Sequence, residues 1–464
     1  MLSDFLYSSI KSQLPFDPTE EQDELIRQLA SFVLSGDERR CFVLRGYAGT
    51  GKTSVLAALV RGLNKVGKTD KVVLLAPTGR AAKVLSRYSG YEASTIHRAI
   101  YRQSKVKDTE AYFSLGYNKA KDTLFIVDEA SMVSNLSDGT GGFGTGNVLE
   151  DLINYVYQGE HCTLLFVGDD AQLPPVGQAT SPALDSNYLI GYGLAVQQYT
   201  LRKVIRQALT SGILTEATRL RFALTESLSQ PFSYKQIAPH PDVTVLKPTE
   251  VQDRLEHSYH EVGIDETLVI TRSNKRTNLY NRAIRARILW KEEQLTPSER
   301  IMVSRNNYFY ETFLANGETL ELLAIRNERE LYGYHFTDAR VRFGNKREEM
   351  TVILWLDTLL TDTPEDSYAM QRDLYYKIAA DYPEIRSRKK LRDKVFESPY
   401  YNALQIRYAY AVTCHKAQGG QWSHVYIDPG ALHDKNPLNQ DDLRWLYTAI
   451  TRATEKIYLL GAEP

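Results

Sequence analysis

The sequence predicts an α/β protein with two parallel sheets, each at the centre of its own domain. Two sets of short apolar runs carry this prediction, namely CFVLR (41–45), VVLLA (72–76), LFIVD (124–128) and TLLFVG (163–168), then TLVIT (267–271), YAVTC (410–414), HVYID (424–428) and KIYLL (456–460). Unbroken apolar runs are typical of strands buried on both faces of a parallel sheet. Between the first two runs, TSVLAALVRGLNKVGK has helical spacing and Gly67 offers a C-cap, which indicates a strand–helix–strand unit.

Two further segments fit neither sheet. Residues about 100–121 alternate polar and apolar around Gly116 and predict a small hairpin. Residues 290–402 combine β-rich stretches with a helix-like region carrying IRSRKKLRDK, which is either a solvated helix face or a functional surface. The expected domains are therefore residues 1–205 with the hairpin inserted, residues 206–289 joined to 403–464, and residues 290–402 as a β-rich insertion.

The composition excludes several classes of protein. The chain has 464 residues, 43% of them hydrophobic and 24% charged, with a net charge of −1, so it is not a uniformly basic nucleic-acid binder. No apolar run approaches the ~18 residues needed to cross a bilayer, and the N-terminal residues show no secretory signal. Three scattered cysteines exclude a disulfide framework and an ordinary structural zinc site. We expect a cytoplasmic or nucleoid-associated protein.

The most specific motif is GYAGTGKT at 46–53, which lies between a predicted buried strand and a predicted helix. Gly46, Gly49 and Gly51 let backbone N–H groups face the phosphates of a nucleotide, and the helix N-terminus adds its dipole. Lys52 would neutralise the β- and γ-phosphates, and Thr53 would bind Mg²⁺. The motif predicts an ATP site.

A pair of carboxylates follows the strand LFIVD in the block LFIVDEAS. Such a pair is often a helix N-cap, but beside a P-loop it suits nucleotide hydrolysis. Asp128 would hold the hydrated Mg²⁺, and Glu129 would orient and deprotonate the attacking water. We expect both side chains in the ATP site.

Every run of the first set ends in an unusual polar tail, and two of these tails are PTGRAAK (77–83) and GDDAQLPPVG (168–177). Ligands of open parallel sheets bind at the carboxyl ends of the strands. Four tails at one edge exceed what a simple kinase needs, which indicates that something besides ATP is sensed.

The order and wording of nine blocks resemble the superfamily 1 helicases, in the 5′-to-3′ group that includes RecD and the phage helicase Dda. The blocks are PTEEQ (18–22), GYAGTGKT, APTGRAAKVL (76–85), STIHR (94–98), VDEAS, GDDAQLPPV, TLRKVIRQ (200–207), YAVTCHKAQGGQW (410–422) and YTAITRAT (447–454). The resemblance covers nearly the whole chain and implies that both sheet domains are RecA-like.

The resemblance also implies roles in the ATP site. Gln22 resembles the glutamine that reads adenine, and Gln172 resembles the residue that senses the γ-phosphate and positions water. Arg206 and Arg452 resemble two arginines that reach the γ-phosphate from the second domain, where a guanidinium binds phosphate oxygens in a fork. Gln418 and Gly419 resemble the turn that links the ATP site to the nucleic acid. Many relatives carry an acidic residue at the position of Gln421, so a ribose contact there is in doubt.

The nucleic-acid contacts that the resemblance implies are hydroxyl, lysine and histidine side chains, namely Thr78, Lys83, Thr95, His97, Thr413, His415 and Lys416. Such groups bind phosphates without reading sequence, as a translocating motor requires. The predicted hairpin occupies the place of a strand-splitting pin, with Phe113 and Tyr117 as the apolar candidates for its tip.

The sequence thus predicts an ATP-dependent DNA helicase that moves 5′ to 3′ on single-stranded DNA, uses ATP and Mg²⁺, opens a duplex fork and works as a monomer. Three alternatives stay open. One is an RNA translocase of the same superfamily, and another is a non-unwinding subunit of a DNA-processing complex. The third is a P-loop kinase or nucleotide switch, which would leave PTGRAAK, STIHR and HKAQGG without a role.

Overall fold

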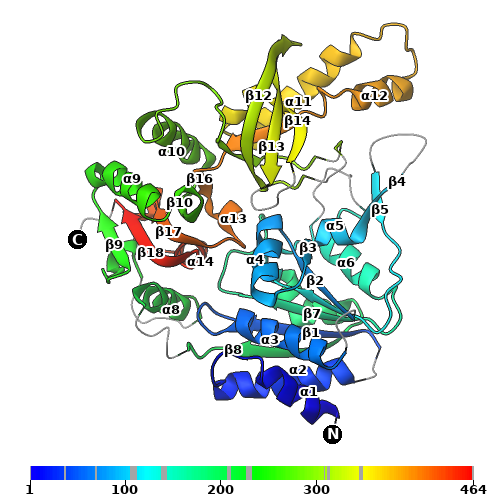
Figure 1. Cartoon of the computed structure of the whole chain (residues 1–464), viewed down its shortest axis with the longest axis vertical. Helices are drawn as coiled ribbons and strands as arrows, with labels where there is room; N and C mark the ends of the chain where they lie inside the picture. Colours follow the sequence, from blue (N-terminus) through cyan, green and yellow to red (C-terminus); the bar gives the residue numbers. More distant parts are fainter. Residues whose placement is uncertain are drawn as a thin grey trace.

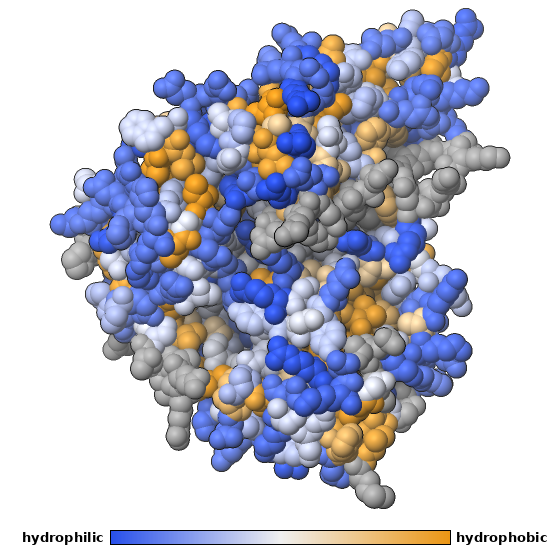
Figure 2. Space-filling model, in the orientation of Figure 1, coloured by the Kyte–Doolittle hydropathy of each residue, from blue (hydrophilic) through white to orange (hydrophobic). Residues whose placement is uncertain are grey.

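The computed structural model describes residues 2–35, 38–67, 71–104, 112–136, 144–205, 211–225, 232–307, 309–310, 314–343 and 349–461. These residues form two parallel sheets, a closed barrel and a two-stranded hairpin (Figure 1). Hydrophilic side chains cover most of the face shown in Figure 2, and the apolar patches between them are small. Among the described helices, none has the length and apolar character that crossing a membrane requires.

The first sheet has six parallel strands in the order β3-β2-β6-β7-β1-β8. Its strands are β1 (Arg40–Gly46), β2 (Val72–Ala76), β3 (Ala93–Thr95), β6 (Leu124–Val127), β7 (Thr163–Gly168) and β8 (Ala195–Leu201). The helices of this part are α1 (Leu2–Lys11), α2 (Glu20–Leu34), α3 (Lys52–Lys65), α4 (Gly79–Ser89), α5 (Ile96–Ile100), α6 (Val148–Val156) and α7 (Ser186–Gly191). All four apolar runs predicted here are strands, and the structure adds β3 and β8 at the two edges of the sheet.

The second sheet has five parallel strands in the order β16-β10-β17-β18-β9. Its strands are β9 (Val243–Leu246), β10 (Thr267–Thr271), β16 (Ala411–Thr413), β17 (Trp422–Ile427) and β18 (Ala453–Leu460). The helices are α8 (Gly212–Thr225), α9 (Val251–Glu261), α10 (Asn274–Arg287), α13 (Cys414–Ala417) and α14 (Gln440–Ile450). The four predicted runs are again strands, and the predicted class of fold is confirmed.

A closed five-stranded barrel is inserted in the chain between β10 and β16, which are neighbours in the second sheet. It consists of β11 (Arg300–Val303), β12 (Thr319–Leu331), β13 (Tyr334–Phe343), β14 (Glu349–Trp355) and β15 (Leu404–Tyr408). The helices α11 (Pro364–Ala379) and α12 (Arg388–Glu397) lie between β14 and β15 and extend beyond the strands in Figure 1. Because β15 pairs with both β11 and β14, we propose that the inserted domain ends near Tyr408 and not at 402.

The hairpin consists of β4 (Tyr101–Ser104) and β5 (Tyr112–Leu115). Residues 105–111, between the two strands in the chain, lie outside the described residues, whereas Phe113 of β5 pairs with Gln103 of β4. Phe113 is partly buried against the apolar core of the first sheet, and Tyr117 follows β5 with 75% of its surface exposed. The expectation that these two side chains form the tip is therefore corrected, because hairpin pairing places them along and beyond the second strand.

One apolar cluster joins the two sheet domains. It contains Tyr47, Ala171 and Leu173 from loops of the first sheet, together with apolar residues of α8, α13 and α14. We call the boundary that this cluster crosses the seam. The carboxyl ends of β1 and β7 face α14 there, so the seam is where groups of both domains meet.

Candidate nucleotide and nucleic-acid site

The P-loop connects the carboxyl end of β1 to the N-terminus of α3. Gly49 and Gly51 have φ values of +75° and +81°, a conformation that glycine adopts at little cost. A Cβ atom at Gly46 would lie 2.7 Å from Cγ of Lys52. Since Gly51 occupies the N-cap position without a capping side chain, the first N–H groups of α3 remain available to an anion.

Lys52 folds back over this loop. Its Nζ donates to the carbonyl of Tyr47 at 3.0 Å and to that of Gly46, and it lies 3.9 Å from Oδ2 of Asp169. The side chain of Asp169 is 1% exposed. The cation is thus held between the loop carbonyls and a buried carboxylate.

Asp128 follows β6 and faces the same loop. Its Oδ1 accepts a hydrogen bond from the backbone N–H of Glu129 at 2.9 Å. Burial raises the pKa of Asp128 to about 7, the charge of Glu129 adds to this effect, and the charge of Lys52 opposes it. A nearby divalent cation would keep the carboxylate ionised.

The donor set fits Mg²⁺. Thr53, in the first turn of α3, offers a hydroxyl and Asp128 offers a carboxylate, both of them the oxygen ligands that Mg²⁺ prefers. Within the described part of the chain, no three His, Cys, Asp or Glu side chains gather into a metal-binding group. Mg²⁺ in nucleotide sites is usually held by one or two carboxylates together with water and substrate phosphates, so Thr53 and Asp128 are the residues that would hold it here.

Glu129 has a left-handed backbone conformation, with φ +51°. For a residue with a side chain this costs about 1–2 kcal/mol, and such strain clusters at active sites. The carboxylate Oε1 lies 3.8 Å from Nη1 of Arg452 across the seam. The strained turn therefore points Glu129 at the other domain.

Gln172 lies after β7 and is 5% exposed. Its side-chain Oε1 is buried and has no hydrogen-bond partner among the described residues. A buried carbonyl oxygen without a partner is costly, and such atoms mark functional sites. The Oε1 atom of Gln172 is therefore suited to accept a hydrogen bond from a water molecule.

Arg452 follows α14 and is 4% exposed. Its guanidinium donates to the carbonyl of Thr448 at 3.1 Å, to the carbonyl of Gly420 at 3.3 Å and to the hydroxyl of Thr451 at 3.3 Å. These bonds fix its direction toward Glu129. The second predicted arginine, Arg206, lies outside the described residues.

The predicted nucleic-acid segments of the two domains touch. A Cβ atom at Gly419, whose φ is +72°, would lie 2.7 Å from Cβ of Ala81 and 3.2 Å from the Thr78 hydroxyl. The guanidinium of Arg80 lies over the ring of Trp422, 4.2 Å from its centroid. The segments after β2 and β16 thus pack closely across the seam.

Hydroxyl side chains cap the helices that follow these strands. Thr78 accepts from the N–H of Ala81 at 3.2 Å and begins α4, and Thr95 accepts from the N–H of Arg98 at 3.2 Å and begins α5. Thr413 holds the corresponding N-cap position before α13, where its side chain makes no capping hydrogen bond. Three helix N-termini therefore carry the predicted phosphate contacts.

The remaining predicted contacts lie on these same helices. Lys83 is exposed on α4, and His97 lies on α5 with its ring 5.6 Å from that of Tyr101. His415 is on α13, where burial lowers its pKa. Lys416, the next residue of α13, donates to Oδ1 of Asn316 in the barrel at 3.2 Å.

Comparison with known proteins covers both domains. Residues 18–221 match the family model described as AAA domain, and residues 408–460 match the UvrD-like helicase C-terminal domain. The ATP-dependent RecD2 DNA helicase of Deinococcus radiodurans is 24% identical over 96% of this chain and 49% of its own. The ATP-dependent DNA helicase dda of enterobacteria phage T4 is 22% identical over 91% of this chain and 94% of its own.

The two matched segments and these two relatives agree with the resemblance to the superfamily 1 helicases of the RecD and Dda type. A solved structure of Pif1 helicases at forked duplex DNA shares this fold, with a TM-score of 0.50 and 17% identity over 97% of this chain and 93% of that chain. An uncharacterised protein of Methanocaldococcus jannaschii is 24% identical over 96% of this chain. The chain spans 38% of the length of that protein and 49% of RecD2.

Within this structure the side-chain amide of Gln22 is already engaged in two hydrogen bonds. Its Nε2 donates to the carbonyl of Thr50 at 2.9 Å, its Oε1 accepts from the N–H of Thr19 at 3.0 Å, and the residue is fully buried. Reading of adenine by Gln22 stays a prediction, and it requires the amide to exchange one of these partners.

Gln418 and Gln421 also have hydrogen-bond partners. Gln418 donates to the carbonyl of Leu173 at 2.8 Å across the seam, and its role in linking the two sites stays a prediction. Gln421 accepts from the hydroxyl of Tyr88 at 3.2 Å. In this structure Gln421 therefore bonds a tyrosine of the first domain.

Sequence reasoning missed several residues of the seam. Tyr447 and Thr448 on α14 bond the first domain directly, and Arg444 donates to the carbonyls of Asp170 and Gln172. The available signal was their position in the block that carries Arg452, because Thr448 lies one helical turn before that arginine.

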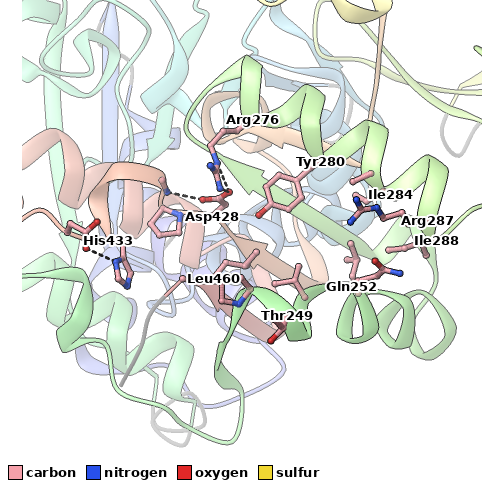
Figure 3. A pocket seen from close by; sticks show the side chains of 18 residues that line it. Thr249, Gln252, Arg276, Tyr280, Ile284, Arg287, Ile288, Asp428, His433 and Leu460 are labelled. Carbon is pink, nitrogen blue, oxygen red and sulfur yellow. Dashed lines mark hydrogen bonds and ion pairs between the residues drawn. The ribbon is translucent and has the colours of Figure 1, made fainter.

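The structure also has a pocket outside the seam. Its volume is about 590 Å³, and it lies between α9 and α10 at the carboxyl ends of β17 and β18. Figure 3 shows Arg276 paired with Asp428 at one side, near Tyr280. Of the described residues that line it, none is a predicted site residue.

DNA affinity is expected to fall between pH 7 and pH 9. Burial lowers the pKa of Lys416 to about 8, with the charge of Arg407 adding to the effect, so above that pH the amine is neutral and binds phosphate less well. Losing one charge-assisted hydrogen bond would weaken binding about tenfold.

The measurement is fluorescence anisotropy with a labelled oligothymidylate at fixed ionic strength. The variant Lys416→Arg keeps its charge across this range and should lose this part of the pH dependence. Identical pH profiles for the two proteins would contradict the expectation.

Proposed function

We propose that this chain is an ATP-driven motor that moves 5′ to 3′ on single-stranded DNA and separates duplex DNA. The observation that carries the proposal is the seam, where Glu129 of the first domain lies 3.8 Å from Arg452 of the second. RecD2 and dda, to which the chain is similar, are both described as ATP-dependent DNA helicases.

Hydrolysis would use groups from both sides of the seam. The P-loop amides and Lys52 hold the phosphates, while Thr53 and Asp128 would hold Mg²⁺, which supplies positive charge to the β- and γ-phosphate oxygens. Gln172 and Glu129 orient a water molecule, whose oxygen bonds the γ-phosphorus as the bond to the ADP oxygen breaks. Glu129 accepts the proton of that water.

Arg452 would convert this chemistry into motion. In the structure its guanidinium lies 3.8 Å from Glu129, so it is aimed at the site across the seam. A γ-phosphate would attract the guanidinium and draw the domains together, and release of phosphate would remove that attraction. Closure and opening are thus tied to the terminal phosphate.

The grip on DNA would change with the same movement. Thr78, Lys83, Thr95 and His97 belong to the first domain, whereas Thr413, His415 and Lys416 belong to the second. Because Gly419 packs against Ala81, movement at the seam directly changes the spacing between the two sets. Each cycle would shift one set along the strand.

ATPase and unwinding assays test this function together. Turnover should rise at least about tenfold with single-stranded DNA, and a duplex with a 5′ tail should open while one with a 3′ tail should not. The reason is that a motor couples hydrolysis to strand binding and moves in one direction.

The other outcomes point to the alternatives. Stronger activation by RNA oligomers than by DNA would favour an RNA translocase, and activation without unwinding of either substrate would favour a non-unwinding subunit. An ATPase rate that nucleic acid leaves unchanged would refute the motor. Binding that weakens linearly on a log salt scale is expected for phosphate contacts.

A further inference from the structure

The hydroxyl of Tyr447 joins α14 to the P-loop. Tyr447 is 1% exposed and lies five residues before Arg452. Its oxygen accepts a hydrogen bond from the backbone N–H of Ala48 at 2.9 Å and donates one to Oδ2 of Asp169 at 2.7 Å. One phenol of the second domain therefore bonds two loops of the first.

Asp169 connects the hydroxyl of Tyr447 to the P-loop lysine, Lys52. Its Oδ1 accepts from the N–H of Ala171 at 3.0 Å, while Oδ2 takes the Tyr447 hydroxyl and lies 3.9 Å from Nζ of Lys52. Burial raises the pKa of Asp169, and Lys52 and Tyr447 both act against that rise. A buried carboxylate is costly without hydrogen-bond or ion-pair partners. Loss of the Tyr447 hydroxyl would therefore strengthen the pairing of Asp169 with Lys52.

Neighbouring contacts hold the same segment. Leu173 donates its N–H to the Thr448 hydroxyl at 2.8 Å and accepts at its carbonyl from Gln418 at 2.8 Å. Arg444 donates to the carbonyl of Gln172 at 3.2 Å. The segment from Asp169 to Leu173, which carries Gln172, is thus held from the second domain along its length.

We propose that Tyr447 is a positioning residue that sets how strongly Asp169 competes with phosphate for Lys52, an inference that rests on the proposed function. With α14 docked, the hydroxyl occupies Oδ2 of Asp169 and the ammonium of Lys52 is available to the nucleotide. When α14 withdraws, Asp169 pairs with Lys52 instead. The ammonium of Lys52 then binds the phosphates more weakly. Opening of the seam and release of the nucleotide are thereby linked.

The test compares two tyrosine variants of the full chain by ATP binding in the presence of Mg²⁺, measured by calorimetry. Tyr447→Phe should bind ATP about tenfold more weakly than wild type, because Asp169 then pairs with Lys52. Tyr426→Phe is the matched control, since that buried hydroxyl donates to the carbonyl of Arg254 at 2.7 Å, away from the seam. Equal affinities for the two variants would overturn the proposal.

A second substitution separates this role from simple support of the fold. Adding Asp169→Asn to Tyr447→Phe should restore ATP affinity to within about twofold of wild type, because an amide does not compete for the ammonium. No restoration would overturn the proposal. If Tyr447→Phe does not fold, Asp169→Asn alone decides, since it should bind ATP at least as tightly as wild type, and tenfold weaker binding would overturn the idea.

These binding experiments do not depend on the motor. If DNA neither accelerates hydrolysis nor is unwound, the proposed function fails. The ATP affinities of wild type and of the Tyr447, Tyr426 and Asp169 variants still decide the role of Tyr447. If the motor works and the affinities do not respond, only the inference about Tyr447 fails.

Discussion

Replacement of Lys52 by alanine is expected to reduce ATP turnover by about 10²- to 10³-fold or more while the chain still folds. The ammonium is the charge nearest the loop carbonyls of Gly46 and Tyr47, where the phosphates would lie. Removing one preorganised group that stabilises the charge of the transition state has an effect of this size. Its structural bonds are few, so the free energy of unfolding should change by only about 1–2 kcal/mol.

The measurement is steady-state phosphate release with saturating single-stranded DNA, alongside urea unfolding. Lys65→Ala is the matched control, because it removes the same charge from an exposed position of the same helix. The control should retain wild-type turnover. Turnover in Lys52→Ala within threefold of that control would show that ATP is not hydrolysed at this loop.

Arg452→Ala is expected to bind ATP and to lose hydrolysis by about 10³- to 10⁵-fold, the value of an arginine that stabilises the transferred phosphoryl group. The guanidinium is preorganised by three hydrogen bonds and faces Glu129 across the seam. Binding should persist because the P-loop is on the other domain.

Single-turnover hydrolysis and ATP binding measured on the same sample separate these effects. Arg272→Ala is a suitable control, since this second-domain arginine pairs with Asp442, which keeps Lys435 as a partner. Arg452→Lys should recover only a small part of the rate, because an ammonium lacks the planar fork. Normal hydrolysis in Arg452→Ala would remove it from the site.

The central strands of the two sheets were predictable, as was β16 at one edge, whereas the edge strands β3, β8 and β9 were not. Strands such as β6 and β7 are buried along their whole length, which requires an unbroken apolar run. The edge strand β8 exposes several of its residues and reads AVQQYTL, whereas β3 has only three residues. A strand with neighbours on one side only is not forced to be apolar, so its sequence carries little signal.

The residues of the candidate site also differ in how far the local sequence indicates them. Lys52, Thr53, Asp128 and Glu129 were predictable because each chemical role needs a particular residue type close to a strand end. Tyr447, by contrast, acts through contacts with Ala48 and Asp169, which are hundreds of residues away in the chain. Contacts of this kind depend on how two domains pack, which no local pattern encodes.

The pairing of the first and last barrel strands has a further consequence. Ile301 of β11 lies opposite Tyr408 of β15, so the chain departs from the second sheet and comes back to it one strand spacing away, roughly 5 Å. The residues inserted between β10 and β16 therefore leave the register of these two strands undisturbed. Evolution can therefore lengthen or shorten this insertion, or add helices to it such as α11 and α12, without rebuilding the two sheet domains.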